Sequence, residues 1–307
     1  MTTTVNEKVL LGMIGGSGLY NLQNLAFVKH VNPETPWGYP SSPITIASLP
    51  SGTRVAFLAR HGSGHTFSPS AVPARANIAA LKSLGVCVIL AFSAVGSLRE
   101  DIPPGTFVLP TQIIDCTKGV RPVSFFEGTS VVAHAAFGDP FSRRLVQWLE
   151  GPVSRALTEE GRGIKFVTNK CIVCMEGPQF STRAESLMYR QWGGDLINMS
   201  VLPEAKLARE AEISYALIAT VTDYDSWRPN TDAVTTAEVF RTLHDNAETS
   251  RRVAKSILQE LYAAVLQGDI LSEEVGSMQA SIMPRSAQQK QADRDKLRYV
   301  LPAYFSD

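Results

Sequence analysis

Seven short apolar runs, rich in β-branched residues, constrain the fold more than any other feature of the chain. Runs of this length predict strands, and near-continuous hydrophobicity predicts strands that are buried on both faces. The predicted strands are Val9–Ile14, Arg54–Leu58, Val86–Phe92, Phe107–Leu109, Phe166–Met175, Leu196–Met199 and Ile213–Val221.

Amphipathic helical patterns lie between several of these runs. They cover Pro73–Leu84, Phe141–Leu157, Arg183–Trp192, Pro203–Ala211 and a long stretch from about Thr235 to Leu266. Thr182 and Thr235 each precede a glutamate by three residues, which is the pattern of a helix-starting capping box, and Gly268 follows the long helix as a stop. Strands that alternate with helices predict an α/β fold, here a single domain with a central mixed β-sheet flanked by helices.

The composition changes near the C-terminus. Residues 1–272 carry the strand and helix patterns and form the predicted domain, whereas residues 273–307 are mostly polar and end in YVLPAYF. We expect a mobile polar tail whose aromatic end docks on the domain.

Charge and cysteine content exclude several classes of partner. The 307 residues include 29 Lys+Arg and 29 Asp+Glu, so no global field attracts nucleic acid or an anionic membrane. The N-terminal segment has no basic region, and no stretch reaches the roughly 20 apolar residues that span a bilayer. Cys171 and Cys174 have a metal-type spacing, but no second pair completes a site, so packing is the favoured interpretation. A soluble protein of the cytoplasm, and also of the nucleus, is expected.

Three predicted strands end in motifs that could bind an anion. Gly15–Gly18 offers backbone N–H groups and a serine hydroxyl, although a tight turn explains it equally well. Ala59–Gly62 adds an arginine, whose guanidinium suits phosphate, and a histidine, whose imidazole can add a hydrogen-bond donor. An arginine at the end of a strand is also often simply solvated. Ala91–Ser97 adds hydroxyls at the carboxyl end of a strand, where open α/β sheets bind ligands.

Three further motifs could recognise an organic ligand. Glu176–Arg183 carries Phe180, which could stack on a planar group or serve as a buried anchor. Ile197–Ser200 is a short strand with another hydroxyl. Thr222–Asp225 holds two carboxylates which, in an extended chain, face the same side, though such carboxylates commonly only form turns.

Taken in order, the motifs IGGSG, ARHG, SAVGSL, EGPQFSTRAES, NMS and TDYDSW resemble the trimeric purine nucleoside phosphorylases, and among them the S-methyl-5'-thioadenosine phosphorylases. The resemblance covers roughly residues 8 to 268. It implies a homotrimer that binds a nucleoside and uses inorganic phosphate as co-substrate, with no cofactor and no metal.

The resemblance also assigns residues to the site. Six positions match those that surround phosphate in the family: Ser17, Arg60, His61, Ser93, Ala94 and Ser200. Base and sugar positions are matched by Phe180, Ile197 and Met199, and the catalytic base-recognition pair by Asp223 and Asp225. The pocket for the 5' group is matched by Val234, Thr236, Val239 and Phe240, with His134 contributed across the trimer interface. From helical spacing alone, Val239 and Phe240 could equally be core.

Phosphorolysis of such a nucleoside places opposite charges on the sugar and the departing base. Phosphate beneath the sugar offsets the positive charge and attacks C1', while Asp223 donates a hydrogen bond or proton at N7, which requires a raised pKa. The family's 6-oxopurine enzymes have asparagine at the position of Asp223, so two acids favour an adenine-type base.

Three alternatives remain open at this stage. A nucleotide-dependent oxidoreductase lacks the expected glycine fingerprint and acidic partner. A nonenzymatic nucleoside-binding protein could share the fold. Sister enzymes that prefer methylthioinosine, 5'-deoxyadenosine or ordinary purine nucleosides differ by few pocket residues.

Overall fold

The computed structural model describes residues 8–19, 25–229, 236–283 and 289–306, with side chains described for all of these except 236–241 and 269. The strands are β1 (Leu11–Gly15), β2 (Ala26–Val31), β3 (Ile44–Ser48), β4 (Arg54–Ala59), β5 (Val88–Ser97), β6 (Phe107–Asp115), β7 (Val132–Ala133), β8 (Phe166–Cys174), β9 (Leu196–Asn198), β10 (Ser214–Asp223) and β11 (Ile282–Met283). The α-helices are α1 (Ala74–Ser83), α2 (Arg143–Glu159), α3 (Arg183–Gln191), α4 (Val201–Glu210), α5 (Thr236–Gln267), α6 (Gln291–Arg298) and α7 (Pro302–Phe305).

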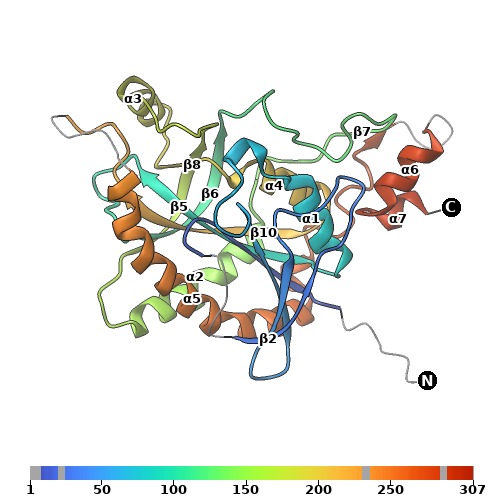
Figure 1. Cartoon of the computed structure of the whole chain (residues 1–307), viewed down its shortest axis with the longest axis horizontal. Coiled ribbons are helices and arrows are strands. Elements are labelled where there is room, and N and C mark those ends of the chain that lie inside the picture. The colour runs from blue at the N-terminus through green and yellow to red at the C-terminus, as the bar shows by residue number, and fades with distance from the viewer. Residues whose placement is uncertain (1–7, 20–24, 230–235, 284–288, 307) are drawn as a thin grey trace.

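A mixed sheet forms the centre of the described chain, in the order β10-β6-β8-β9-β5-β1-β4-β3-β2. The long strand β5 pairs in parallel with both β1 and β10 and turns antiparallel to β9 at its end. Because β10 returns to pair with β5, the strands β5, β10, β6, β8 and β9 close into a ring. In Figure 1, α2 and α5 lie on one side of this sheet and α1 and α4 on the other. The α/β prediction with a central mixed sheet is confirmed.

Local sequence signals explain several element boundaries. The capping box at the start of α3 is present, since the Thr182 hydroxyl accepts from the Glu185 N–H and the Glu185 carboxylate accepts from the Thr182 N–H at 2.8 Å. Helix α5 ends at Gln267, and Gly268 follows with φ of +89°, as expected of a glycine stop. The second expected capping residue, Thr235, lies outside the described residues.

The segment after residue 272 differs from the mobile tail that its polar composition suggested. It contains β11, which pairs with β7, and the helices α6 and α7 at the edge of the domain (Figure 1). Leu297, Val300 and Phe305 are fully buried, and the Phe305 ring lies 6.5 Å from that of Phe126 between centroids. Three well-spaced apolar side chains are enough to dock a polar segment, and composition averaged over the segment conceals them.

No helix among the described residues is long and apolar enough to cross a membrane. Cys174 is buried, and desolvation raises the pKa of its thiol to about 12, so it packs as an inert apolar side chain. The described cysteines are free thiols, Cys171 among them.

Candidate active site

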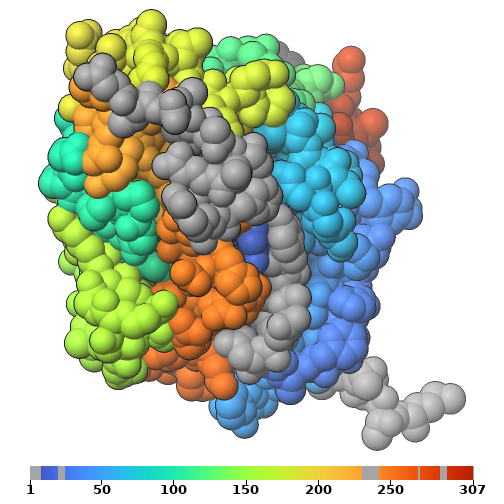
Figure 2. Space-filling model, turned by 60° about the vertical axis from the view of Figure 1, so that its left-hand side comes forward, coloured from blue at the N-terminus to red at the C-terminus, as the bar shows by residue number. Residues whose placement is uncertain are grey.

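One pocket gathers the strand-end motifs. It lies where β1, β4 and β10 end and β5 crosses to β9, because these paired strands bring their termini to one region. The pocket is lined by Ser17, Arg60, His61, His65, Pro69, Ser93, Ala94, Val95, Gly96, Met175, Pro178, Phe180, Ile197, Asn198, Met199, Ser200, Thr222, Asp223, Asp225 and Leu243. Figure 2 shows the face that carries α5 (orange), where a small dark blue patch from residues 8–19 is visible beside this helix.

Arg60 lies at one end of the pocket and is held rigidly. Its side chain is buried, and its Nε and Nη2 donate to the two carboxylate oxygens of Glu204 at 2.8 and 2.9 Å. Nη1 donates to the Phe92 carbonyl at 2.9 Å, and the Tyr215 hydroxyl donates to Glu204 at 2.6 Å. These bonds use three of the five guanidinium N–H groups, which leaves two for an anion in the pocket.

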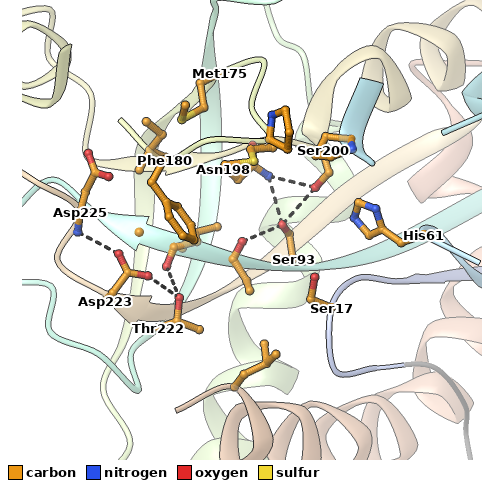
Figure 3. A pocket seen from close by; sticks show the side chains of 18 of the residues that line it. Ser17, His61, Ser93, Met175, Phe180, Asn198, Ser200, Thr222, Asp223 and Asp225 are labelled. Carbon is orange, nitrogen blue, oxygen red and sulfur yellow. Dashed lines mark hydrogen bonds between the residues drawn. The ribbon is translucent and has the colours of Figure 1, made fainter. Parts of the chain in front are cut away.

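Three hydroxyl groups accompany Arg60. Ser93 and Ser200 lie 3.2 Å apart between their oxygens, and the Asn198 amide donates to Ser93 at 3.1 Å (Figure 3). Ser17 follows Gly16, where a Cβ atom would come within 2.9 Å of the Arg60 Nη1 and 2.7 Å of the Phe92 carbonyl oxygen. Glycine at position 16 therefore lets the backbone approach the guanidinium, and the cluster is suited to bind an oxyanion.

His61 is fixed by the tight loop that follows β4. Gly62 has φ of +77°, and a Cβ there would meet the Thr66 hydroxyl at 2.7 Å, so only glycine fits. The turn lets Phe67 N–H donate to the His61 carbonyl, while His61 Nδ1 donates to the Phe67 carbonyl at 3.0 Å. Burial, followed by the positive charge of Arg60, lowers the pKa of His61 to about 4.

This lowered pKa predicts a pH dependence of stability. The native pKa of about 4 lies below the ordinary histidine pKa of roughly 6.5, so the unfolded chain binds a proton at higher pH than the native one does. The contribution of neutral His61 to the free energy of unfolding is fully present above roughly pH 6.5. It is lost as the pH falls towards 4, and the free energy of unfolding then decreases by up to about 1.4 kcal/mol per pH unit. Urea denaturation of wild type and His61→Gln at pH values in this range should show that the free energy of unfolding falls less steeply with decreasing pH in the variant. Parallel curves would contradict the assignment.

Two carboxylates occupy the other end of the pocket (Figure 3). Strand β10 ends at Asp223, and Asp225 has φ of +36°, so the chain turns between them and is not extended as we expected from the sequence. The Asp225 N–H donates to Asp223 Oδ1 at 2.9 Å, and both side chains still line the pocket. Burial raises the pKa of Asp225, which opposes ionisation of that carboxyl group.

A β-bulge brings a hydroxyl to Asp223. The register of β10 against β5 shifts between Val221 and Asp223, and the Thr222 hydroxyl lies 2.7 Å from Asp223 Oδ2 and 3.2 Å from the Val95 carbonyl oxygen. The Thr222 hydroxyl has a single proton, so it donates either to Asp223 Oδ2, which lies closer, or to the Val95 carbonyl. The β-bulge and this contact fix the orientation of the Asp223 carboxyl group at the end of the pocket.

Gly96 lines the pocket next to Asp223. A Cβ there would lie 3.0 Å from Ile197 Cγ2 and 3.1 Å from Asp223 Oδ1. We expect Gly96→Ala to displace the carboxylate and lower kcat/KM about 10- to 100-fold, because small misplacements of reacting groups are costly. Steady-state kinetics test this, with Gly151→Ala in α2 as control, since the nearest atom to its Cβ is 3.7 Å away. Equal losses in both variants would contradict the assignment.

Apolar side chains lie between the two ends. Ile197 and Asn198 are buried, Met175 and Met199 line the same pocket, and the Phe180 ring points into it (Figure 3). Phe180 is 41% exposed, so it is not the buried anchor that the sequence left open as an alternative. An aromatic ring at the mouth of a pocket is placed to cover a planar ligand.

A family model described as the phosphorylase superfamily matches residues 11–260. The chain belongs to the phosphorylase superfamily. It is 64% identical to S-methyl-5'-thioadenosine phosphorylase of Coprinopsis cinerea, with 98% of each chain covered. It is 50% identical to the enzyme of the same name from Schizosaccharomyces pombe, with 96% of each covered.

Solved structures of the superfamily agree with this fold. A methylthioadenosine phosphorylase from an antarctic soil metagenomic library has a TM-score of 0.86 at 41% identity, covering 96% of this chain and 99% of its own. A mutant of adenosine/methylthioadenosine phosphorylase from Schistosoma mansoni, in complex with methylthioadenosine, has a TM-score of 0.78 at 31% identity, covering 90% and 99%.

Most residues that the family resemblance assigned to the site lie together in the pocket; one does not, and four positions have no described side chain. His134 is exposed beside β7, away from the pocket, and its N–H donates to the Ser281 carbonyl. The side chains of Val239 and Phe240 lie outside the described residues, as do Val234 and the side chain of Thr236. The roles given to these positions stay predictions.

Arg121 is a supporting residue of this superfamily member that sequence reasoning missed. Its buried guanidinium donates to the carbonyls of Met199, Leu202 and Glu176 at 2.6–2.7 Å and to the Glu176 carboxylate at 3.1 Å. It therefore ties the ends of β8 and β9 together beside the pocket. No motif surrounds it, and its partners lie 55 to 81 residues away in the sequence, so no local signal could have found it.

Proposed function

We propose that this chain catalyses the phosphorolysis of S-methyl-5'-thioadenosine to adenine and 5-methylthioribose 1-phosphate, a reaction of methionine and purine salvage. The observation that carries the proposal is the separation of two chemically distinct ends in one pocket. Arg60 and the serine hydroxyls lie at one end, and two buried carboxylates lie at the other. Full-length identity of 64% to a phosphorylase of this name supports the same substrate.

The anion end binds inorganic phosphate in this proposal. Two N–H groups of Arg60 and the hydroxyls of Ser17, Ser93 and Ser200 donate to phosphate oxygens, with Ala94 lining the same end. The bound anion offsets the positive charge that develops on the ribose and then attacks C1' with inversion. The proposed reaction needs no cofactor and no metal.

The carboxylate end binds the base. Asp223, whose carboxyl group accepts from the Thr222 hydroxyl, donates a hydrogen bond or proton to N7 of the departing purine and offsets its negative charge. Adenine presents a 6-amino donor beside N7, so a second acidic side chain, Asp225, suits it better than it suits a 6-oxopurine. Ile197, Met199 and Phe180 enclose the nucleoside between the two ends.

The 5' group and the quaternary structure belong to the same proposal. Val239 and Phe240 would line an apolar pocket for the methylthio group. His134 would reach the site from a neighbouring subunit of a homotrimer, because in its own subunit it is exposed beside β7. The proposed ligand is a small-molecule nucleoside. No helix in the described part of the chain could span a membrane.

The test is release of free adenine from methylthioadenosine with and without phosphate. The proposal predicts release only with phosphate, and a slower reaction with adenosine and with inosine. Equal release without phosphate would indicate a hydrolase, and no release under either condition would indicate a binding protein. A faster reaction with inosine than with methylthioadenosine would favour a sister nucleoside phosphorylase.

A further inference from the structure

The tautomer of His61 is set by its own loop. Nδ1 lies 3.0 Å from the Phe67 carbonyl oxygen, and a carbonyl oxygen can only accept, so Nδ1 carries a proton. The reciprocal bond from the Phe67 N–H to the His61 carbonyl holds the loop in this arrangement. A neutral imidazole has one N–H group, so its Nε2 is then a hydrogen-bond acceptor.

The surroundings of His61 oppose a second proton on Nε2. The side chain is buried, and the His65 ring stacks on it with centroids 4.3 Å apart. The charged groups around it are Arg60, which pairs with Glu204, and Arg121, which pairs with Glu176. These neighbouring arginines, and His65 when protonated, all repel an imidazolium, so the ring stays neutral at the pH of the cytoplasm.

His61 faces the anion end of the pocket. Figure 3 shows its ring across from the Ser93 and Ser200 hydroxyls, with Ser17 on the adjoining side. Because Nδ1 is engaged by the loop, Nε2 is the ring nitrogen left for the pocket. The anion end therefore combines several donors with one fixed acceptor, although the sequence suggested that His61 would add a donor.

We infer that His61 accepts a hydrogen bond from a protonated oxygen of the bound anion, so that the site selects oxyanions that carry an O–H group. A fully deprotonated oxyanion has only acceptor oxygens, and one of them would face the Nε2 lone pair without a proton between them. Hydrogenphosphate and hydrogenarsenate supply that proton, whereas sulfate and selenate do not. The inference rests on the proposed function, since it takes the anion end to be the phosphate site.

Two size-matched pairs of anions test the inference in the wild-type protein without catalysis. Thermal denaturation is followed near neutral pH while phosphate, sulfate, arsenate or selenate is added, because an anion that binds the native state raises Tm with its concentration. We expect phosphate to bind at least about tenfold more tightly than sulfate, and arsenate to exceed selenate likewise, because an unpaired acceptor penalises the analogue that lacks the proton. Equal affinities within each pair, or no binding of any of the four anions, would overturn the inference.

His61→Gln is the informative variant, because a carboxamide can turn its NH₂ group towards a fully deprotonated anion. Phosphate should lose affinity and sulfate should gain it, so that the difference falls to about threefold or less. His30→Gln is the matched control, since His30 is exposed on β2, and it should keep the wild-type order. Undiminished discrimination in His61→Gln would overturn the inference. Selective phosphate binding without phosphate-dependent adenine release would instead refute the proposed function and leave the inference standing.

Discussion

Replacing Arg60 with alanine is expected to lower phosphate-dependent turnover about 100-fold or more and to destabilise the fold by about 3–5 kcal/mol. The catalytic loss follows because the two N–H groups left for phosphate disappear. The stability loss follows because Glu204 stays buried at 4% exposure without its partner cation. Steady-state kinetics and urea denaturation measure the two effects separately.

A compound variant separates the two roles of Arg60. In Arg60→Met/Glu204→Met/Tyr215→Phe no buried charge or hydroxyl of this cluster lacks a partner, so stability should return to within about 1–2 kcal/mol of wild type. Turnover should stay as low as in the single variant, since no guanidinium is present. Recovery of turnover together with stability would show that Arg60 acts only through the fold.

Asp223→Asn is expected to lower kcat/KM for methylthioadenosine by about 10²- to 10⁴-fold, the range typical of losing a general acid. The same change should raise the preference for inosine relative to methylthioadenosine, because an amide can adapt to the 6-oxo edge better than two acids can. Phosphorolysis rates with both nucleosides test the prediction. The asparagine oxygen can still accept from the Asp225 N–H, and its NH₂ group can donate to the Thr222 hydroxyl, which then donates to the Val95 carbonyl, so little unfolding is expected.

Asp101→Asn provides the matched control, because Asp101 is exposed and does not line the pocket. It should leave both rates unchanged. Unchanged relative kcat/KM values for the two nucleosides in Asp223→Asn would contradict the assignment of Asp223 to the base.

The sequence predicted those site residues that directly follow a strand, because the ends of the strands determine where these residues lie. Ser17, Arg60 and Ser93 each follow an apolar run, and parallel pairing of β1, β4 and β5 brings the ends of those runs together. The hydrophobic pattern predicts both the strands and the edge where ligands bind. All seven predicted strands are present, with boundaries that differ by up to six residues, as at the end of β6.

What the sequence could not predict depends on partners far apart in the chain. Glu204 lies 144 residues from Arg60, and nothing local indicates that the two form a buried pair. In strand β2 the short apolar run Ala26–Val28 is exposed and is followed by Lys29 and His30, so the strand and its pairing with β3 were missed. The turn at Asp225 depends on a positive φ at a non-glycine residue, which the spacing of two acids does not indicate.

Identification of the sugar product tests the central claim most directly. Methylthioadenosine is incubated with the protein and phosphate, and phosphorus NMR is used to quantify the sugar phosphate beside chromatographic quantification of adenine. The account predicts one 5-methylthioribose 1-phosphate for each adenine released, with the α configuration expected of inversion at C1'. Adenine accompanied by free methylthioribose, with no phosphate ester formed, would contradict it.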